Sequence, residues 1–276
     1  KYTEKLGSAQ CKSSIMLGAI KTPGTTIIKA KKSRNHTELI YQFLKIPIKF
    51  IKKKQYDLIE VRGPSNFSGF NYIVPGDISS AAFFIVLTLL SKNSKIILRN
   101  INVNSSRIGI IKILNRMNAN INLKNKRLYN GENIGDIIVK SRNNLKSINS
   151  PKNLNSSAID EFLVIFLVAA KAKGISKFKN LSELNNKESP RLEIALKFLK
   201  QIGVKYSRKS DNIKIYGNPN LKLNGEYFIK NFRKDHRVFM MSCIAALTFG
   251  GKWKIDDKDS INTSFPIFLK LLKKLG

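Results

Sequence analysis

The chain has 276 residues, of which 42% are hydrophobic and 25% charged, so it can bury a large core, is long enough for two ordinary domains, and is not a disordered tail. Lysine (39), isoleucine (36) and asparagine (28) make up over a third of it, whereas arginine is rare (11). The net charge of +32 is spread over every segment without an aromatic-interleaved RNA motif or zinc-finger spacing, so we do not expect dedicated nucleic-acid binding.

The apolar stretches and the cysteines indicate a cytoplasmic protein. The longest uncharged apolar runs, near 81–90 and 162–170, are shorter than the roughly 18 to 20 residues of a membrane span. Cys11 and Cys243 lie singly in apolar helical patterns without CxxC spacing, so we expect two small core residues and a reduced compartment.

One pattern recurs four times along the chain: a polar cluster, an apolar helix, a turn and a short strand. The polar clusters contain Ser8, Asp77, Asp160 and Asp235. The apolar helices are expected to run through 11–20, 81–90, 162–172 and 238–247, and the strands through 22–30, 91–100, 173–181 and 250–257.

A second, amphipathic helix follows each of these strands, with apolar residues at helical spacing and lysines on the other face. These helices are expected at 36–46, 107–121, 190–203 and 265–276, and strand pairs at 49–63, 121–141 and 204–217. The unit is therefore β-α-β-α-β-β, which predicts an α/β (α+β) fold. We expect the first helix of each unit to be buried and the second to lie outside.

The polar clusters also indicate the ligand. A buried helix leaves amide donors unsatisfied at its N-terminus, where the helix dipole places a partial positive charge. Several such N-termini facing one cleft favour an anion site. The sequence therefore predicts a multiply charged substrate.

The clusters together resemble one enzyme family, 5-enolpyruvylshikimate-3-phosphate synthase (3-phosphoshikimate 1-carboxyvinyltransferase). Any one motif is weak, but seven occur in order, each at a helix start of the repeat. They are Gly7-Ser8-Ala9-Gln10, Ser33-Arg34-Asn35-His36-Thr37-Glu38, Pro75-Gly76-Asp77-Ile78-Ser79-Ser80-Ala81, Ile159-Asp160-Glu161-Phe162, Lys187-Glu188-Ser189-Pro190-Arg191-Leu192, Asp235-His236-Arg237 and Thr263-Ser264-Phe265-Pro266.

The resemblance implies the enolpyruvyl transferase fold, an inside-out α/β barrel of two domains with three units each and the active site in the cleft between them. This chain has four of the six units. Residues 1–75 would be the third unit of the upper domain, and 76–276 the lower domain. Roughly 150 residues of the family pattern would be missing, two repeats of the length seen here.

The resemblance also implies a reaction on the shikimate pathway to chorismate and the aromatic amino acids. The 5-hydroxyl of shikimate 3-phosphate attacks phosphoenolpyruvate, and the tetrahedral adduct eliminates phosphate. No metal or organic cofactor is expected, and the complete protein is expected to be a monomer. The activity of this chain alone is in question, and we expect it to bind phosphoenolpyruvate weakly.

The family's site residues carry over position by position. The catalytic pair is Asp160 and Glu188. Residues for shikimate 3-phosphate are Ser8, Ala9, Gln10, Arg34, Asp160 and Lys187, and those for phosphoenolpyruvate are Gln10, Arg191 and Arg237.

Some of these residues have plainer interpretations. Asp160 alone would fit a simple helix N-cap equally well, and His236 is expected to be a structural neighbour of Arg237. Pro190 stands where the family usually has Asp. With Ser189 as N-cap, it would fall at the first helical position, where proline is tolerated.

Two alternatives stay open. UDP-N-acetylglucosamine enolpyruvyl transferase shares the fold, although the Lys-Glu-Ser-x-Arg and Asp-His-Arg motifs favour the shikimate enzyme. From a different class, the chain would be an inactive basic fragment that binds nucleic acid.

Overall fold

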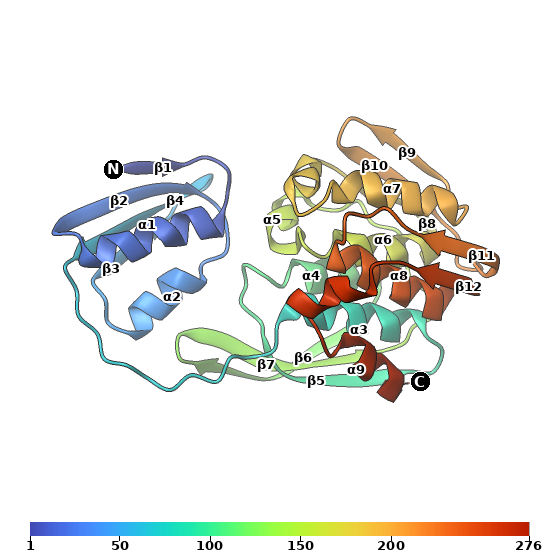
Figure 1. Cartoon of the computed structure of the whole chain (residues 1–276), viewed down its shortest axis with the longest axis horizontal. Coiled ribbons are helices and arrows are strands. Elements are labelled where there is room, and N and C mark those ends of the chain that lie inside the picture. The colour runs from blue at the N-terminus through green and yellow to red at the C-terminus, as the bar shows by residue number, and fades with distance from the viewer. Residues whose placement is uncertain (276) are drawn as a thin grey trace.

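The computed structural model describes residues 1–275 and has two lobes joined by an extended segment (Figure 1). We call residues 1–63 the first lobe and 78–275 the second lobe. The first lobe contains β1 (Tyr2–Glu4), α1 (Ala9–Lys21), β2 (Gly24–Lys31), α2 (His36–Phe43), β3 (Ile48–Lys52) and β4 (Tyr56–Gly63).

The first lobe is one four-stranded sheet with two helices. The strand order is β1-β2-β4-β3, with β1 parallel to β2 and the other pairs antiparallel. Alternate residues of β4 point into the core, as a half-buried strand requires. Ile59 and Val61 of this strand pack with Met16 of α1 and Ile28 of β2 in a core separate from that of the second lobe.

The second lobe begins with α3 and continues through three further groups of elements. The first group is α3 (Ile78–Leu90), β5 (Lys95–Asn102), α4 (Gly109–Arg116), β6 (Asn120–Tyr129) and β7 (Glu132–Lys140). The second is η1 (Lys152–Leu154), α5 (Asn155–Ala158), α6 (Phe162–Lys171), β8 (Gly174–Phe178), η2 (Ser182–Asn186), α7 (Arg191–Gln201), β9 (Tyr206–Lys209) and β10 (Asn212–Gly217). The third is β11 (Leu223–Ile229), α8 (His236–Phe249), β12 (Gly250–Ile255), η3 (Lys258–Thr263) and α9 (Phe268–Leu275).

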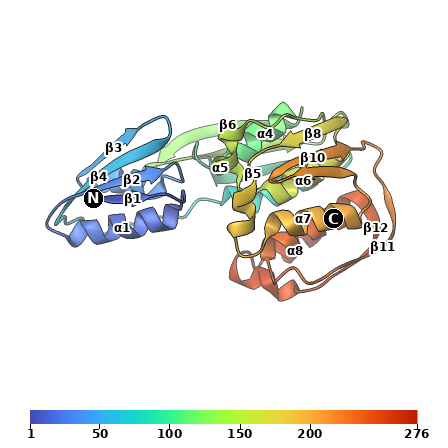
Figure 2. The same cartoon turned by 90° about the horizontal axis from the view of Figure 1, so that it is seen from above.

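Three apolar helices, α3, α6 and α8, pack against one another in the second lobe, with sheets and amphipathic helices around them (Figures 1 and 2). The sheets are β5-β7-β6, β8-β10-β9 and the parallel pair β11-β12. Every residue of α6 except Lys171 is buried, whereas α7 buries one face and exposes Glu193, Lys197 and Lys200. The expected buried and outer helices are confirmed in this lobe.

The first strand of the unit is complete in only two of the four copies. β1 and β11 are strands that pair in parallel with β2 and β12. In the other two copies, isolated parallel bridges take the place of this strand. One copy has a bridge between Gly76 and Ile101, and the other has two bridges, Lys146 with Lys173 and Asn149 with Lys177. The β-α-β-α-β-β prediction therefore holds for the order of elements, while two first strands shrink to bridges.

The first lobe corrects one prediction, that α1 and its cysteine are buried. Cys11 is exposed and Leu17 is 60% exposed. α1 packs on β2 and β4 and contacts α2 through Lys12 and Ser13, while no helix within residues 1–275 covers the face that contains Leu17. Cys243 is half-buried on α8. Cys11 is therefore a surface thiol, not a core residue.

The start of α7 corrects a second prediction by one residue. Pro190 is the N-cap, and the helix begins at Arg191. The Ser189 hydroxyl does not cap the helix, because it donates to Asp235 Oδ2 at 2.7 Å. The expected helix forms despite the proline.

Two glycines allow a strand to touch the end of a buried helix. A Cβ at Gly63 would lie 2.3 Å from the carbonyl oxygen of Ala19 in α1, and one at Gly217 would lie 2.0 Å from that of Ala172 after α6. The same contact thus occurs in two copies of the unit.

Within residues 1–275, the helices are too short or too polar to cross a bilayer.

Candidate active site between the lobes

Asp160 is the centre of a cluster of cations where the two lobes meet. It lies in the turn between α5 and α6 and is 8% exposed. Arg34 of the first lobe pairs with its Oδ2, and Lys187 Nζ and Arg191 Nη1 lie 3.7 and 3.6 Å from its Oδ1. The helix N-cap is the next residue, which makes no capping hydrogen bond. Asp160 therefore does not serve as the cap that the sequence alone allowed.

The cations around Asp160 set its ionisation. Burial alone would raise the pKa of this carboxyl, but Arg237, Arg34 and Lys187 outweigh that effect and hold its pKa at about 2. The carboxylate is therefore fully ionised at neutral pH, and it has the geometry of an anchor for cations or hydroxyl groups.

Arg191 is buried, and two of its three side-chain nitrogens are hydrogen-bonded to acidic partners. Its Nε donates to Asp235 Oδ2 at 2.9 Å, and its Nη2 donates to Glu188 Oε2 at 2.6 Å. Burial would raise the pKa of Asp235, but the hydrogen bonds from Arg191 and Ser189 outweigh it, so this pKa is below its ordinary value. Asp235 also caps α8 by accepting from the Arg237 amide. The starts of α7 and α8 are thus joined through one carboxylate.

Arg237 is held differently from Arg191. Its Nη1 donates to the carbonyl oxygen of Asp160 at 3.2 Å and lies 4.0 Å from Glu161 Oε1. Within residues 1–275, its Nε and Nη2 have no hydrogen-bond partner. This edge of the guanidinium is the one that can bind a carboxylate or phosphate with two parallel hydrogen bonds.

The expected structural role of His236 agrees with its surroundings. Burial and the charge of Arg237 lower the pKa of this histidine. The ring lies beside the cluster, at the first position of α8.

The start of α1 is connected to the cluster through Arg34. Ser8 caps the helix by accepting from the Cys11 amide at 3.2 Å, and Ala9 and Gln10 form the first turn. Lys12, one turn on, donates to the Arg34 carbonyl oxygen at 2.6 Å. Within residues 1–275, Ser8, Ala9 and Gln10 make no direct contact with the Asp160 cluster through their side chains.

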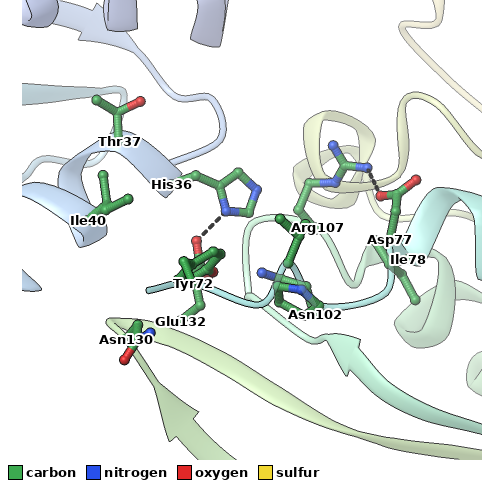
Figure 3. A pocket seen from close by; sticks show the side chains of 12 residues that line it. His36, Thr37, Ile40, Tyr72, Asp77, Ile78, Asn102, Arg107, Asn130 and Glu132 are labelled. Carbon is green, nitrogen blue, oxygen red and sulfur yellow. Dashed lines mark hydrogen bonds and ion pairs between the residues drawn. The ribbon is translucent and has the colours of Figure 1, made fainter. Parts of the chain in front are cut away.

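Three consecutive residues of the first lobe contact the second lobe. Arg34 reaches Asp160, Asn35 Oδ1 accepts from Asn104 Nδ2 at 3.0 Å, and His36 Nδ1 pairs with Glu132 (Figure 3). Burial alone would raise the pKa of Glu132, but His36 and Asn104 outweigh it and lower that pKa.

A cavity of about 350 Å³ lies beside these contacts. His36, Tyr72, Asp77, Arg107 and Glu132 line it with neighbours from both lobes and the connecting segment (Figure 3). Its charged groups are already paired with one another, as the dashed lines to Glu132 and Asp77 show.

The structure brings together most of the residues predicted from the sequence. Arg34, Asp160, Lys187, Glu188, Arg191 and Arg237 form one connected set of ion pairs and hydrogen bonds. Within residues 1–275, no group of three or more His, Cys, Asp or Glu side chains is placed to hold a metal ion.

Sequence reasoning missed several polar groups beside this set. Ser79, Arg107 and Glu161 form a buried chain next to Arg237. The Ser33 hydroxyl is buried and has no hydrogen-bond partner within residues 1–275. Ser33, Ser79 and Glu161 lie inside the motifs that resemble the family, and Arg107 does not. Their place in these motifs is the sequence signal that could have identified them.

Comparison with known proteins identifies the family. The family model described as EPSP synthase (3-phosphoshikimate 1-carboxyvinyltransferase) matches residues 1–272. The 3-phosphoshikimate 1-carboxyvinyltransferase of Petrotoga mobilis is 34% identical over 276 residues, and that of Zymomonas mobilis is 35% identical over 278. These alignments cover 99% and 100% of this chain, and 62% and 61% of the relatives.

Solved structures give the same picture. An EPSP synthase from Acinetobacter baumannii has a TM-score of 0.89 and 33% identity, covering 100% of this chain and 62% of that one. The enolpyruvyl transferase NikO from Streptomyces tendae has a TM-score of 0.70 at 15% identity, covering 100% of this chain and 64% of that one, which shows a shared fold alone. The chain spans about 62% of the length of the curated relatives it matches, and it belongs to the EPSP synthase family.

Proposed function

We propose that this chain is part of an enzyme that transfers the carboxyvinyl (enolpyruvyl) group of phosphoenolpyruvate to the 5-hydroxyl of shikimate 3-phosphate, with release of phosphate. The observation that carries the proposal is the cluster of four cations around Asp160 at the junction of the lobes. Two substrates with two phosphates and two carboxylates between them need such a concentration of positive charge.

In the proposed reaction, the hydroxyl oxygen bonds to C2 of phosphoenolpyruvate, and its proton passes to the Asp160 carboxylate. Glu188 gives a proton to C3, which completes a tetrahedral adduct. The bond from C2 to the phosphate oxygen then breaks, and the departing phosphate takes up the proton that the hydroxyl gave to Asp160. C3 returns a proton to Glu188 as the double bond re-forms. Acid and base groups in these positions are the expected means of catalysis.

The pKa of Asp160 gives Arg34 a part in this sequence. A carboxylate with a pKa of about 2 is a weak base, because basicity falls with pKa. In the proposed complex, the anionic substrate shares Arg34 with Asp160, which weakens one of the interactions that lower this pKa. Substrate binding would therefore raise the basicity of Asp160.

The remaining site residues are assigned by substrate. Ser8, Ala9, Gln10, Arg34, Asp160 and Lys187 bind shikimate 3-phosphate, and Gln10, Arg191 and Arg237 bind phosphoenolpyruvate. The free edge of Arg237 supports the second assignment most directly. Arg191 contributes through its Nη1, since its Nε and Nη2 are already bonded.

The proposal includes the domain division and the setting. Residues 1–75 form the third unit of an upper domain and 76–276 a lower domain of three units, a division that two separate hydrophobic cores support. The two free cysteines support a reducing, cytoplasmic setting. A monomeric state when complete would be checked by light scattering.

The comparisons favour the shikimate enzyme over the UDP-N-acetylglucosamine enolpyruvyl transferase, because the Petrotoga mobilis and Zymomonas mobilis relatives are both named 3-phosphoshikimate 1-carboxyvinyltransferase. The family match over residues 1–272 likewise gives no support to an inactive fragment that binds nucleic acid.

The proposed function is tested by phosphate release from phosphoenolpyruvate and shikimate 3-phosphate. The chain is assayed alone and after addition of the part of the Petrotoga mobilis relative that it does not match. We expect turnover at least in the mixture, and Asp160→Asn and Glu188→Gln should each lower it by about 100- to 10,000-fold. Glu193→Gln, which changes an exposed carboxylate on α7 outside the proposed site, is the matched control and should leave turnover unchanged. Absence of turnover in both assays would count against the proposal.

A further inference from the structure

Glu161 is a buried carboxylate to which the proposed reaction gives no part. It is 2% exposed and precedes the first residue of α6. Burial raises its pKa above the ordinary value, so an ionised carboxylate here is unfavourable unless neighbours hold it. Because Glu161 is buried beside Asp160, its carboxylate needs hydrogen-bond or ion-pair partners within the protein.

One side of Glu161 is held by a chain of buried groups. The Ser79 hydroxyl donates to Glu161 Oε1 and accepts from Arg107 Nη2, which also donates to Asp77 Oδ1 at 3.3 Å. Ser79 is 1% exposed and Arg107 is 8% exposed. Asp77 is the N-cap of α3, so this chain fixes Glu161 to the start of the first buried helix of the lobe.

The same carboxylate oxygen of Glu161 also faces Arg237. Nη1 of this arginine lies 4.0 Å from Glu161 Oε1 and donates to the neighbouring Asp160 carbonyl oxygen. Both the hydrogen-bonded carbonyl oxygen and the ion-paired carboxylate oxygen come from the turn before α6. Because the guanidinium is planar, holding Nη1 from this side fixes the direction of the opposite edge, which contains Nε and Nη2.

Arg191 shows that this arrangement is particular to Arg237. Its Nε and Nη2 are bonded to Asp235 and Glu188, so the same edge is occupied by the protein. The two arginines therefore have different roles. Arg191 joins the helix starts, and Arg237 presents two unused donors.

We propose that Glu161 is the positioning residue for Arg237: supported by Ser79 and Arg107, it holds the guanidinium so that the Nε and Nη2 edge faces the anionic group of the substrate. This inference rests on the proposed function for the identity of that anion, phosphoenolpyruvate. It does not make Glu161 a catalytic residue, because Glu161 acts through Arg237.

The first test observes Arg237 itself in the full 276-residue chain by ¹⁵N NMR of arginine side chains. The Nε–H resonance of Arg237 is assigned by its disappearance in Arg237→Lys. We expect it to be ordered in the wild type and to become mobile in Glu161→Gln, which keeps the shape but removes the charge. Ser79→Ala, a smaller change at the same site, should loosen it to a lesser degree. The half-exposed Arg208 is the internal control and should not change.

The second test measures phosphoenolpyruvate binding by calorimetry, with shikimate 3-phosphate present and the Petrotoga mobilis segment added. Glu161→Gln should weaken binding by about tenfold, the effect of losing one restraint on a charged donor. An equally ordered Arg237 resonance in Glu161→Gln would overturn the positioning role, even if the variant binds weakly. If no form binds phosphoenolpyruvate, the proposed function fails, and the resonance still decides the role of Glu161.

Discussion

Lys12 of α1 and Glu38 of α2 form an ion pair inside the first lobe, with Nζ 2.6 Å from Oε1 and both side chains 1% exposed. Apart from Lys12, the Glu38 carboxylate has no polar partner within residues 1–275, so Lys12 is the group that offsets its burial. Because Lys12 also donates to the Arg34 carbonyl oxygen, the pair links α1 to the loop that contacts Asp160.

Removing Lys12 should therefore destabilise the first lobe. Lys12→Met leaves a buried carboxylate without a compensating charge, and the expected loss in free energy of unfolding is about 3 to 5 kcal/mol. Urea denaturation followed by circular dichroism measures it. The matched control is Glu226→Gln, which breaks an exposed pair with Lys252 and should leave the unfolding curve in place. Equal effects of the two changes would show that the buried pair is not needed for stability.

Arg191 and Arg237 should respond differently to truncation. Arg191→Ala leaves Asp235 buried without its main partner and should lower the free energy of unfolding by about 3 to 5 kcal/mol. Arg237→Ala removes a side chain with two unpaired donors, so it should weaken phosphoenolpyruvate binding by about 10- to 100-fold with a smaller change in stability. Calorimetric binding in the assembled mixture and urea denaturation of the chain separate the two effects. A loss of stability in Arg237→Ala as large as in Arg191→Ala would contradict this division.

Stability should fall in acid through Asp160. Its pKa is lowered from 3.8 to about 2, so the folded state holds fewer protons than the unfolded state between these values. The stabilisation is present above the unfolded pKa and is lost as pH falls through the folded pKa, with a contribution of about 2 kcal/mol at neutral pH. Urea denaturation at several pH values from about 5 to about 2 should show a shallower slope for Asp160→Asn than for the wild type. Parallel slopes would contradict the ion pairs described for this carboxylate.

Gly217 should tolerate no side chain. A Cβ there would lie 2.0 Å from the Ala172 carbonyl oxygen and 2.5 Å from that of Ala169, so Gly217→Ala must move β10 away from α6 and should lower stability by about 1 to 3 kcal/mol. Gly18, inside α1, has no such neighbour within 4 Å. Gly18→Ala should raise stability by about 0.5 to 1 kcal/mol, and thermal unfolding of both variants tests this difference in sign.

Much of the fold follows from local sequence signals. Ser8, Asp77 and Asp235 cap the helices expected after them, because a side-chain oxygen before an apolar run satisfies the first free amides. The apolar runs of α3 and α6 have no polar face and are buried. These features depend on residues that are neighbours in sequence, so the local sequence pattern is enough to predict them.

Features that depend on distant contacts were not predictable. The prediction that α1 is buried is wrong at Leu17, because no second helix covers that side within residues 1–275. An apolar run in the sequence does not show whether such a partner helix is present. The Ser189 hydroxyl turns to Asp235, 46 positions away, and so leaves the N-cap to Pro190. Glu161 gains its partners from α3 and α8. Motif order located the site, whereas the pairing inside it required the structure.

The close approach at Gly63 and Gly217 has a consequence for how this gene can change. Codons for lysine, isoleucine and asparagine are rich in A and T, and these three residues are in excess here, so mutation has run towards AT-rich codons. Every glycine codon begins with GG, and such drift would convert it to a residue with a side chain. At these two positions that side chain would meet a helix carbonyl at 2.3 or 2.0 Å. Selection for a stable protein is therefore expected to oppose this drift at these two codons.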